Sequence, residues 1–251
     1  MARQKGIIKL KGTIGDVSFY KSKDGYLARE KGGVDGERIK NDPAFQRTRE
    51  NGSEFGRAGK AGKMLRTALR LMLQNGSDTK VTSRLTKEMM RVIKSDDQNA
   101  RGERNLSGGN LNLLDGFDFN INSKLGSTLF AQYGTTLDRA SNSAGVDFED
   151  FVPKNSIAYP TGATHMKLVA GIAEIDFVEE TFKFSKDETA ELPIDEQVVA
   201  GFSLAPELTV GTDDDIFFAL GIEFMQEVNG SFYALRNGAF NPLTLVIVSQ
   251  G

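Results

Sequence analysis

The sequence predicts an α+β protein, in which a basic N-terminal β-hairpin, an extended arm and basic helices precede an antiparallel β-sandwich or barrel-like domain. Three observations predict this class. Apolar residues recur with a helical period between residues 44 and 95, and beyond residue 115 they alternate or form short runs between turn residues. Residues 1–110 carry 24 Lys and Arg against 13 Asp and Glu, whereas residues 111–251 carry 7 against 21. We therefore expect two domains, a basic one over residues 1–110 and an acidic one over residues 111–251.

The first expected element is a β-hairpin over residues 7–30. Ile14, Val17 and Phe19 belong to a strand-like run, and Asp24-Gly25 supplies the turn, because glycine tolerates the positive φ of a tight turn. An isolated hairpin is only marginally stable in water. It therefore has to dock, either on the rest of the chain or on the open sheet edge of a neighbouring subunit.

An extended arm and a long helix are expected next. Residues 31–44 form the arm, since Gly32-Gly33, Gly36 and Pro43 interrupt them. The helix covers residues 44–74, with Asn41-Asp42-Pro43 as its start signal and Asn75-Gly76 at its end. One side of the helix is apolar and is expected to face the core; it consists of Phe55, Ala58, Leu65, Leu69 and Met72.

Four glycines interrupt this helix at spacings of three and four residues: Gly52, Gly56, Gly59 and Gly62. Each glycine inside a helix costs about 0.5–1 kcal/mol relative to alanine. The four therefore indicate either a close approach by another backbone or a break in the helix near residues 52–62.

A second helix over residues 79–95 is expected from the spacing of Val81, Leu85 and Met89. The polar, glycine-rich residues 95–112 then mark the expected domain boundary. Seven or eight strand-like runs follow between residues 115 and 251, and Asn229-Gly230 and Asn237-Gly238 are strong hairpin signals among them. Residues 134–163 show little periodicity and are expected to be rich in loops.

The residue types that most enzyme chemistry needs are scarce. The chain has no cysteine, which excludes disulfides, thiolate nucleophiles, Cys-ligated zinc and iron–sulfur clusters. A single histidine, His165, excludes a multi-histidine metal site, and no Gly-x-Ser-x-Gly elbow accompanies it. Residues 59–63 lack the hydroxyl residue of a phosphate-binding loop. We therefore predict a non-enzymatic protein with no catalytic residue, cofactor or metal site.

Two acidic clusters are candidate cation sites: one consists of Asp213, Asp214 and Asp215, and the other of Asp147, Glu149 and Asp150. Calcium requires six or more oxygen ligands, often arranged around a glycine turn. Neither cluster matches the calcium loop of an EF-hand, so solvated loop charge is the simpler interpretation.

The opposite charge of the two halves has three interpretations. The halves can pack on each other within one chain, the basic half of one copy can meet the acidic half of the next, or the basic half can bind nucleic acid. A head-to-tail contact between copies propagates into rings, tubes or filaments. The side chains expected at such a contact are Arg49, Arg57, Lys60, Lys63 and Arg66, opposite Asp213, Asp214 and Asp215 or the cluster at residues 147–150.

The leading functional hypothesis is a self-assembling structural subunit, a homo-oligomer or polymer that builds a filament, a tube or a virus-like particle. The alternative is a nucleic-acid-binding protein that acts through the basic helices. A hydrolase or carbohydrate-binding module is disfavoured by the lack of tryptophan. No apolar run reaches the ~18–20 residues of a membrane span, and no signal peptide is recognised, so synthesis in the cytoplasm is expected, with the final location (virion, extracellular filament or cytoplasm) left open.

The N-terminal quarter also resembles a known family. The residues that carry the resemblance are 11–16 (Lys-Gly-Thr-Ile-Gly-Asp), 25–29 (Gly-Tyr-Leu-Ala-Arg) and 41–49 (Asn-Asp-Pro-Ala-Phe-Gln-Arg-Thr-Arg). They are similar to the start of a family of uncharacterised bacterial proteins, in which a glycine-rich hairpin precedes a basic helix. The resemblance implies no activity and no site residues.

Overall fold

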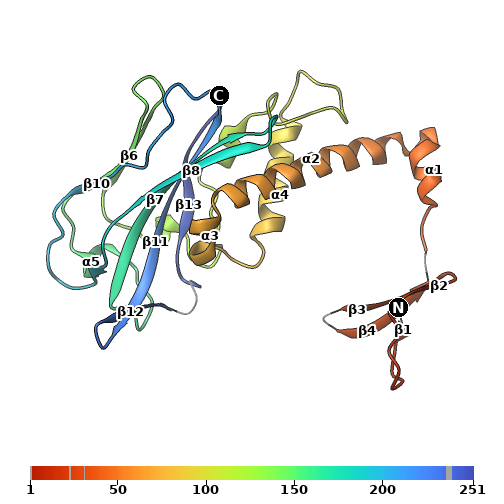
Figure 1. The fold of residues 1–251 in the computed structure, drawn as a ribbon, viewed down its shortest axis with the longest axis horizontal. Coiled ribbons are helices and arrows are strands. Elements are labelled where there is room, and N and C mark those ends of the chain that lie inside the picture. The colour runs from red at the N-terminus through yellow and green to blue at the C-terminus, as the bar shows by residue number, and fades with distance from the viewer. Residues whose placement is uncertain (1, 23, 31, 236–238) are drawn as a thin grey trace. The chain divides into compact units, whose positions relative to one another are not determined.

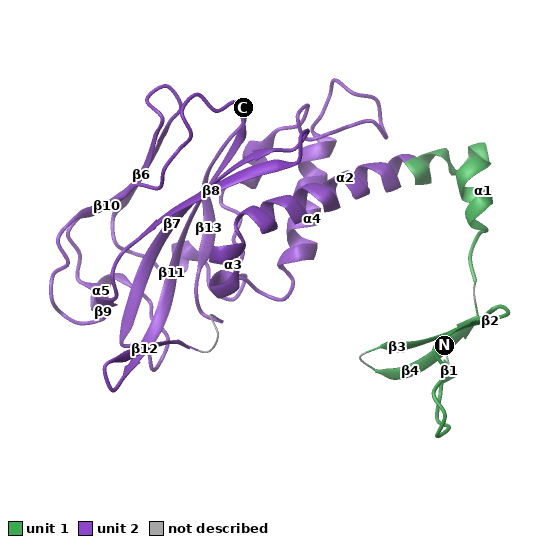
Figure 2. Ribbon diagram, viewed as in Figure 1, with its two compact units in different colours: residues 1–49 green, residues 50–251 purple. Residues whose placement is uncertain are grey.

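The chain divides into two compact units, residues 1–49 and 50–251 (Figure 2). The computed structural model describes residues 2–22, 24–30, 32–235 and 239–251. The division between Arg49 and Glu50 differs from the expected boundary between residues 110 and 111. The basic helices fall in the same unit as the long β-strands, because their apolar sides share a hydrophobic core with those strands.

The N-terminal unit is built around a small antiparallel sheet. Its elements are the strands β1 (Ala2–Arg3), β2 (Gly12–Ile14), β3 (Val17–Ser22) and β4 (Gly25–Glu30), the helix α1 (Gly36–Asn41) and the 3₁₀ helix η1 (Pro43–Phe45). The strand order is β1-β4-β3-β2 (Figure 1). The predicted hairpin is confirmed, since β3 pairs with β4 from Val17 opposite Glu30 to Ser22 opposite Gly25. Lys23, which belongs to the predicted turn, lies outside the described residues.

The segment expected to be an extended arm contains a short helix. Asp35 caps α1 by accepting a hydrogen bond from the N–H of Glu37 at 3.2 Å. Asp42 similarly caps η1, since its carboxylate accepts from the N–H of Ala44 at 2.9 Å. The predicted start signal at Asp42-Pro43 is thus used, although a 3₁₀ turn separates it from the long helix.

Three helices follow: α2 (Gln46–Ala68), α3 (Arg70–Gly76) and α4 (Val81–Lys94). The first predicted helix is therefore broken, but at Leu69 and not among the glycines. A Cβ atom at Gly52, Gly56 or Gly59 would meet nothing within 4 Å, so no other part of the described chain approaches these glycines closely. The break at Leu69 lets α3 change direction so that Met72 packs against Gly171 in the sheet.

Phe55 does not face the core as predicted and is 61% exposed. At this turn of α2 the inner side is occupied by Glu54 and Ala58. Glu54 is buried because its carboxylate accepts a hydrogen bond from the N–H of Gly102 at 2.9 Å. The polar loop around Gly102 therefore covers the inner side of this helical turn, which the hydrophobic pattern had predicted Phe55 to occupy.

The remaining elements are mostly strands. They are the 3₁₀ helices η2 (Leu111–Leu114) and η3 (Leu125–Ser127), the short helix α5 (Pro153–Ser156), and the strands β5 (Tyr133–Asp138), β6 (Ser143–Phe148), β7 (His165–Asp176), β8 (Thr181–Glu188), β9 (Leu192–Pro193), β10 (Phe202–Leu204), β11 (Asp215–Val228), β12 (Ser231–Ala234) and β13 (Leu243–Ser249). Residues 134–163, expected to be loop-rich, thus contain two paired strands. The turn predicted at Asn237-Gly238 lies outside the described residues.

The strands of the second unit form two antiparallel sheets. The larger one is curled and runs β12-β11-β7-β8, with β13 also on β11 and β9 also on β7 (Figure 1). The smaller one has the order β10-β6-β5. The pairing of β13 with β11 shifts register between Phe218 and Ala219, where Val246 of β13 is skipped, and this lets β13 follow the curl.

The central strands of the large sheet, β7 and β11, are apolar on both faces, because each of their faces is covered. One face carries Val169, Ala173 and Phe217 and packs against the helices. The opposite face carries Leu168, Ile172 and Phe218 and packs against the smaller sheet. The predicted α+β class is confirmed, with helices, the large sheet and the small sheet as successive layers of this unit. No helix in the described ranges is long and apolar enough to cross a lipid bilayer.

Candidate subunit interface

The sheet of the N-terminal unit has almost no core of its own. Among the described residues of this unit, Leu27 is the only buried side chain. Ile14, Val17 and Phe19 share one face by their register, and all three keep contact with solvent. Positive charge lies over the aromatic rings of the sheet: Lys21 lies 5.7 Å from the centroid of Tyr26, and Arg29 lies 5.7 Å from that of Tyr20.

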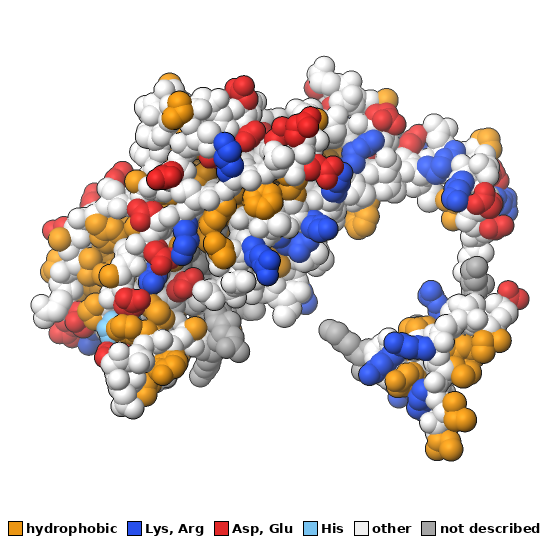
Figure 3. Space-filling model, viewed as in Figure 1, with side chains coloured by type: hydrophobic (Ala, Val, Ile, Leu, Met, Phe, Trp, Pro, Cys, Tyr) orange, Lys and Arg blue, Asp and Glu red, His pale blue; other side chains and the backbone are white. Residues whose placement is uncertain are grey.

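A loop between β1 and β2 projects from this sheet and carries the two most exposed large apolar side chains among the described residues of the N-terminal unit. The side chain of Gln4 closes the loop, since its Oε1 accepts from the N–H of Leu10 at 2.8 Å and its Nε2 donates to the carbonyl of Leu27 at 3.1 Å. Ile7 is fully exposed in the loop, and Ile8 beside it is largely exposed. Hydrophobic side chains are visible on the surface of the N-terminal unit in Figure 3. We call residues 5–9 the isoleucine knob. The hairpin predicted over residues 7–30 includes both isoleucines, whereas the first strand after the loop begins at Gly12. The lysines on either side of the two isoleucines, Lys5 and Lys9, are the sequence signal for an exposed loop.

Most of the predicted basic contact residues are bound within the chain. Arg49 donates to the carbonyls of Ile39 at 2.7 Å and Asp42 at 2.9 Å, and Arg57 donates to those of Gly102 at 2.6 Å and Arg104 at 2.9 Å. Arg49 thus joins α2 to α1 and its C-cap, and Arg57 joins α2 to the loop at residues 102–104.

The other three predicted basic residues differ in their environment. Arg66 donates to the carbonyl of Gly62 one turn earlier at 3.1 Å, and Lys63 lies on the exposed side of α2. Lys60 forms an ion pair with Glu180 in the β7–β8 turn. This pair joins the basic and acidic halves within one chain, which was one of the three interpretations of the charge pattern.

The predicted acidic residues lie in two separate places. Arg139 holds the turn before β11 by donating to the carbonyls of Thr212 at 3.1 Å and Asp214 at 3.0 Å. Asp215 accepts from the N–H of Gly251 at 3.1 Å, and its burial raises the pKa of its carboxyl group above the ordinary value. Asp213 is exposed at the same turn. The basic set on α2 and this turn are not brought into contact within the described structure.

The second acidic cluster lies at the end of β6, with Asp147 in the strand and Glu149 and Asp150 just after it. Asp150 accepts from the N–H of Gly201 at 2.6 Å, Asp147 accepts a hydrogen bond from the hydroxyl of Ser203, and Glu149 is exposed. Within the ranges that the structure describes, no group of three or more His, Asp or Glu side chains is placed to hold a metal ion.

Glu149 and Asp150 border an open hollow of about 550 Å³. Its apolar lining includes Phe130, 59% exposed, and Val198, 64% exposed. Its walls are held together by a backbone bridge, in which Phe151 and Val199 exchange hydrogen bonds of 3.1 and 2.8 Å. Nothing in the local sequence signals this hollow, because it is formed by three segments that are distant along the chain.

His165 lies at the start of β7. Its Nδ1 is 3.0 Å from the hydroxyl of Thr164, and its ring packs edge-on against Phe232 with 4.7 Å between centroids. Its Nε2 lies 3.8 Å from the carboxylate of Glu227. The hydroxyl of Thr164 also accepts a hydrogen bond from the N–H of Glu227 at 2.8 Å, so these groups connect the start of β7 to the end of β11.

Comparisons with protein-family models, with curated proteins and with solved structures found no match for this chain.

Proposed function

We propose that the chain is a non-enzymatic structural subunit that assembles with copies of itself into a filament, a tube or a virus-like particle. The observation that carries this proposal is the N-terminal sheet, which buries only Leu27 among its described residues. Because this sheet lacks a core of its own, we assign it the role of binding a neighbouring copy.

The energetics of the small sheet support docking. Ordering a residue costs about 1–2 kcal/mol in backbone entropy, and a sheet without a buried face gains little to offset this cost. Burying an isoleucine side chain contributes about 1.5–3 kcal/mol. Ile7, Ile8 and Ile14 are all exposed, so a partner that covers them supplies the stabilisation that the unit lacks.

The charge pattern supports a partner of the same sequence. The sheet unit is rich in Lys and Arg, and residues 111–251 carry a charge of −14. A contact between two different surfaces of identical chains is heterologous, so it repeats from copy to copy and builds a ring or an open polymer.

The test is the particle size of the purified full-length protein, measured by light scattering and negative-stain microscopy. We expect large homopolymers that dissociate when salt is added, because salt screens the contact between basic and acidic surfaces. Deletion of residues 1–40 should abolish assembly and leave the folded second unit, which contains both large hydrophobic clusters. A full-length protein that stays monomeric at high concentration and low ionic strength contradicts the proposal.

Nucleic-acid binding, the alternative function, has less support. The guanidinium groups of Arg49, Arg57 and Arg84 all donate to backbone carbonyls, which leaves them less available for phosphates. The same preparation tests it: retention on random DNA that falls steeply with salt, without particles, would favour nucleic-acid binding.

A further inference from the structure

The isoleucine knob has the form of an insertion element. It is closed at its base by the Gln4 side chain, and Lys9 also donates to the carbonyl of Gln4. This bonding holds Ile7 and Ile8 outward from the sheet. Lys5 at the start of the knob and Lys11 just beyond its end are both exposed. The knob is therefore an apolar tip surrounded by positive charge.

The hollow beside β6 has the complementary properties. Its apolar surface is formed by Phe130, Phe151 and Val198, and its border carries Glu149 and Asp150. Its volume of about 550 Å³ lies within the ~300–1,000 Å³ that binding pockets commonly occupy. An exposed apolar surface with a charged border is a common mark of a protein-binding site.

The charge at the border of the hollow favours a neighbouring copy as the partner. The hollow is lined by residues of α5 and of the segment just after β6, which includes Glu149 and Asp150. Each copy of the chain carries a knob whose lysines have the opposite charge. A second copy therefore supplies both the apolar tip and the positive charge that complement the hollow.

We infer that the isoleucine knob of one copy occupies the Phe130–Val198 hollow of the next copy, with the lysines of the knob facing Glu149 and Asp150. This inference rests on the proposed function and specifies its contact. The knob and the hollow are different surfaces, so each copy presents one and receives the other. The assembly is held by apolar insertion at the centre of the contact and by charge at its border.

Disulfide trapping tests this contact directly, because the chain has no cysteine of its own. Full-length Ile8→Cys and Val198→Cys proteins are mixed under assembly conditions and oxidised, and the products are separated without reductant. A disulfide requires Cα atoms within about 4–7 Å of each other, so it forms only if the knob enters the hollow. The matched control replaces Val198→Cys by Val210→Cys, since Val210 is also a highly exposed valine of the second unit.

The expected product is a dimer with one chain of each variant, at a yield about tenfold above that of the control, because docked thiols have a high effective concentration. Particles that form without this excess overturn the knob contact and leave the proposed function intact. A cross-link confined within single chains of the double variant Ile8→Cys/Val198→Cys also overturns it, since the knob then binds its own hollow. The absence of both particles and cross-links contradicts the proposed function itself.

Discussion

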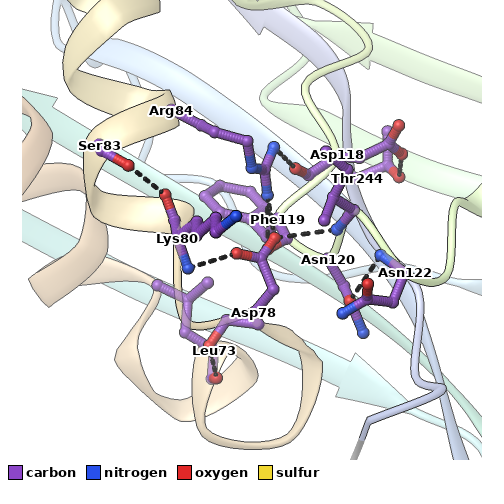
Figure 4. Close-up of polar contacts among 12 residues, drawn as sticks. Leu73, Asp78, Lys80, Ser83, Arg84, Asp118, Phe119, Asn120, Asn122 and Thr244 are labelled. Carbon is purple, nitrogen blue, oxygen red and sulfur yellow. Dashed lines mark hydrogen bonds and ion pairs between the residues drawn. The ribbon is translucent and has the colours of Figure 1, made fainter.

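Asp78 and Arg84 form an ion pair that fastens α4 to residues 117–121 of the same unit (Figure 4). Asp78 is almost completely buried at this position, and its carboxylate also accepts from the N–H groups of Lys80 at 2.6 Å and Ile121 at 2.9 Å. Arg84 donates in addition to the carbonyls of Asp118 at 2.7 Å and Phe119 at 3.0 Å. The pair therefore forms hydrogen bonds with backbone groups at the start of α4 and in residues 118–121, which belong to the predicted β domain.

Replacement of Arg84 should destabilise the second unit strongly. Arg84→Met removes the partner of a buried carboxylate and leaves two carbonyls without a donor, so we expect a loss of about 3 kcal/mol in the free energy of unfolding. Urea unfolding followed by circular dichroism measures it. The matched control is Arg91→Met on the same helix, because Arg91 pairs with Glu88 in an exposed position that contributes less than about 0.5 kcal/mol. Equal losses from the two variants would contradict a structural role for the pair.

The Arg84 pair also illustrates what the sequence could not predict. The helical period identified the apolar side of α4, and Leu85 and Met89 are buried as that period requires. The same period does not identify the role of Arg84, which donates to carbonyls 34 and 35 residues away. A long basic side chain can reach many loop carbonyls, and which of them it reaches depends on tertiary packing.

Asp96 is expected to make folding sensitive to acid. Its carboxylate accepts from the N–H of Asn105 at 3.0 Å, from the side chain of Asn99 at 2.9 Å, and from the N–H groups of Asn99 at 3.1 Å and Gln98 at 3.0 Å. These bonds, led by that from Asn105, lower the pKa of Asp96 to about 2. An aspartate has a pKa of about 3.9 in an unfolded chain, so the stabilisation is present above pH 4 and is lost as the pH falls towards 2.

The measurement is the urea midpoint as a function of pH. Asp96→Asn should be less stable than the wild type at pH 6, because the amide nitrogen faces N–H donors, and its midpoint should change less between pH 4 and pH 2. Asp97→Asn is the control, since Asp97 is exposed next to it. A wild type and an Asp96→Asn variant with parallel pH profiles would show that this carboxylate does not cause the acid sensitivity.

Two glycines should respond in opposite directions to alanine. A Cβ atom at Gly109 would lie 2.3 Å from the carbonyl oxygen of Val92, so Gly109→Ala forces the backbone apart and should cost about 1–3 kcal/mol. A Cβ atom at Gly56 meets nothing, and Gly56→Ala should raise the stability by about 0.5–1 kcal/mol through helix propensity. Thermal unfolding measures both. If Gly56→Ala were more stable but no longer assembled, the added methyl group would have to clash with a neighbouring copy that packs against α2.

The domain boundary was the largest difference between prediction and structure. Charge changes sign near residue 110, yet α2 and α4 are in one unit with the large sheet because Leu65 and Leu85 need an apolar partner. Burial of apolar surface decides which elements belong together, and surface charge decides little. The break at Leu69 has the same origin, since no glycine or proline marks it and only packing on the sheet requires it.

Asn241 is expected to be one of the most important polar residues of the core. It is buried, its Oδ1 accepts from the N–H of Phe224 on β11 at 3.0 Å, and its Nδ2 donates to the carbonyl of Asn75 at the end of α3 at 2.9 Å. Asn241→Ala leaves both backbone groups without a partner and should cost about 2–3 kcal/mol. Asn241→Asp keeps the acceptor for Phe224 but places a carboxylate against the Asn75 carbonyl, so it should be at least as damaging. Asn122→Ala, an exposed asparagine, should stay within about 0.5 kcal/mol of the wild type in the same urea titration. If Asn241→Ala were as stable as Asn122→Ala, the link between α3 and β11 would depend on apolar packing alone.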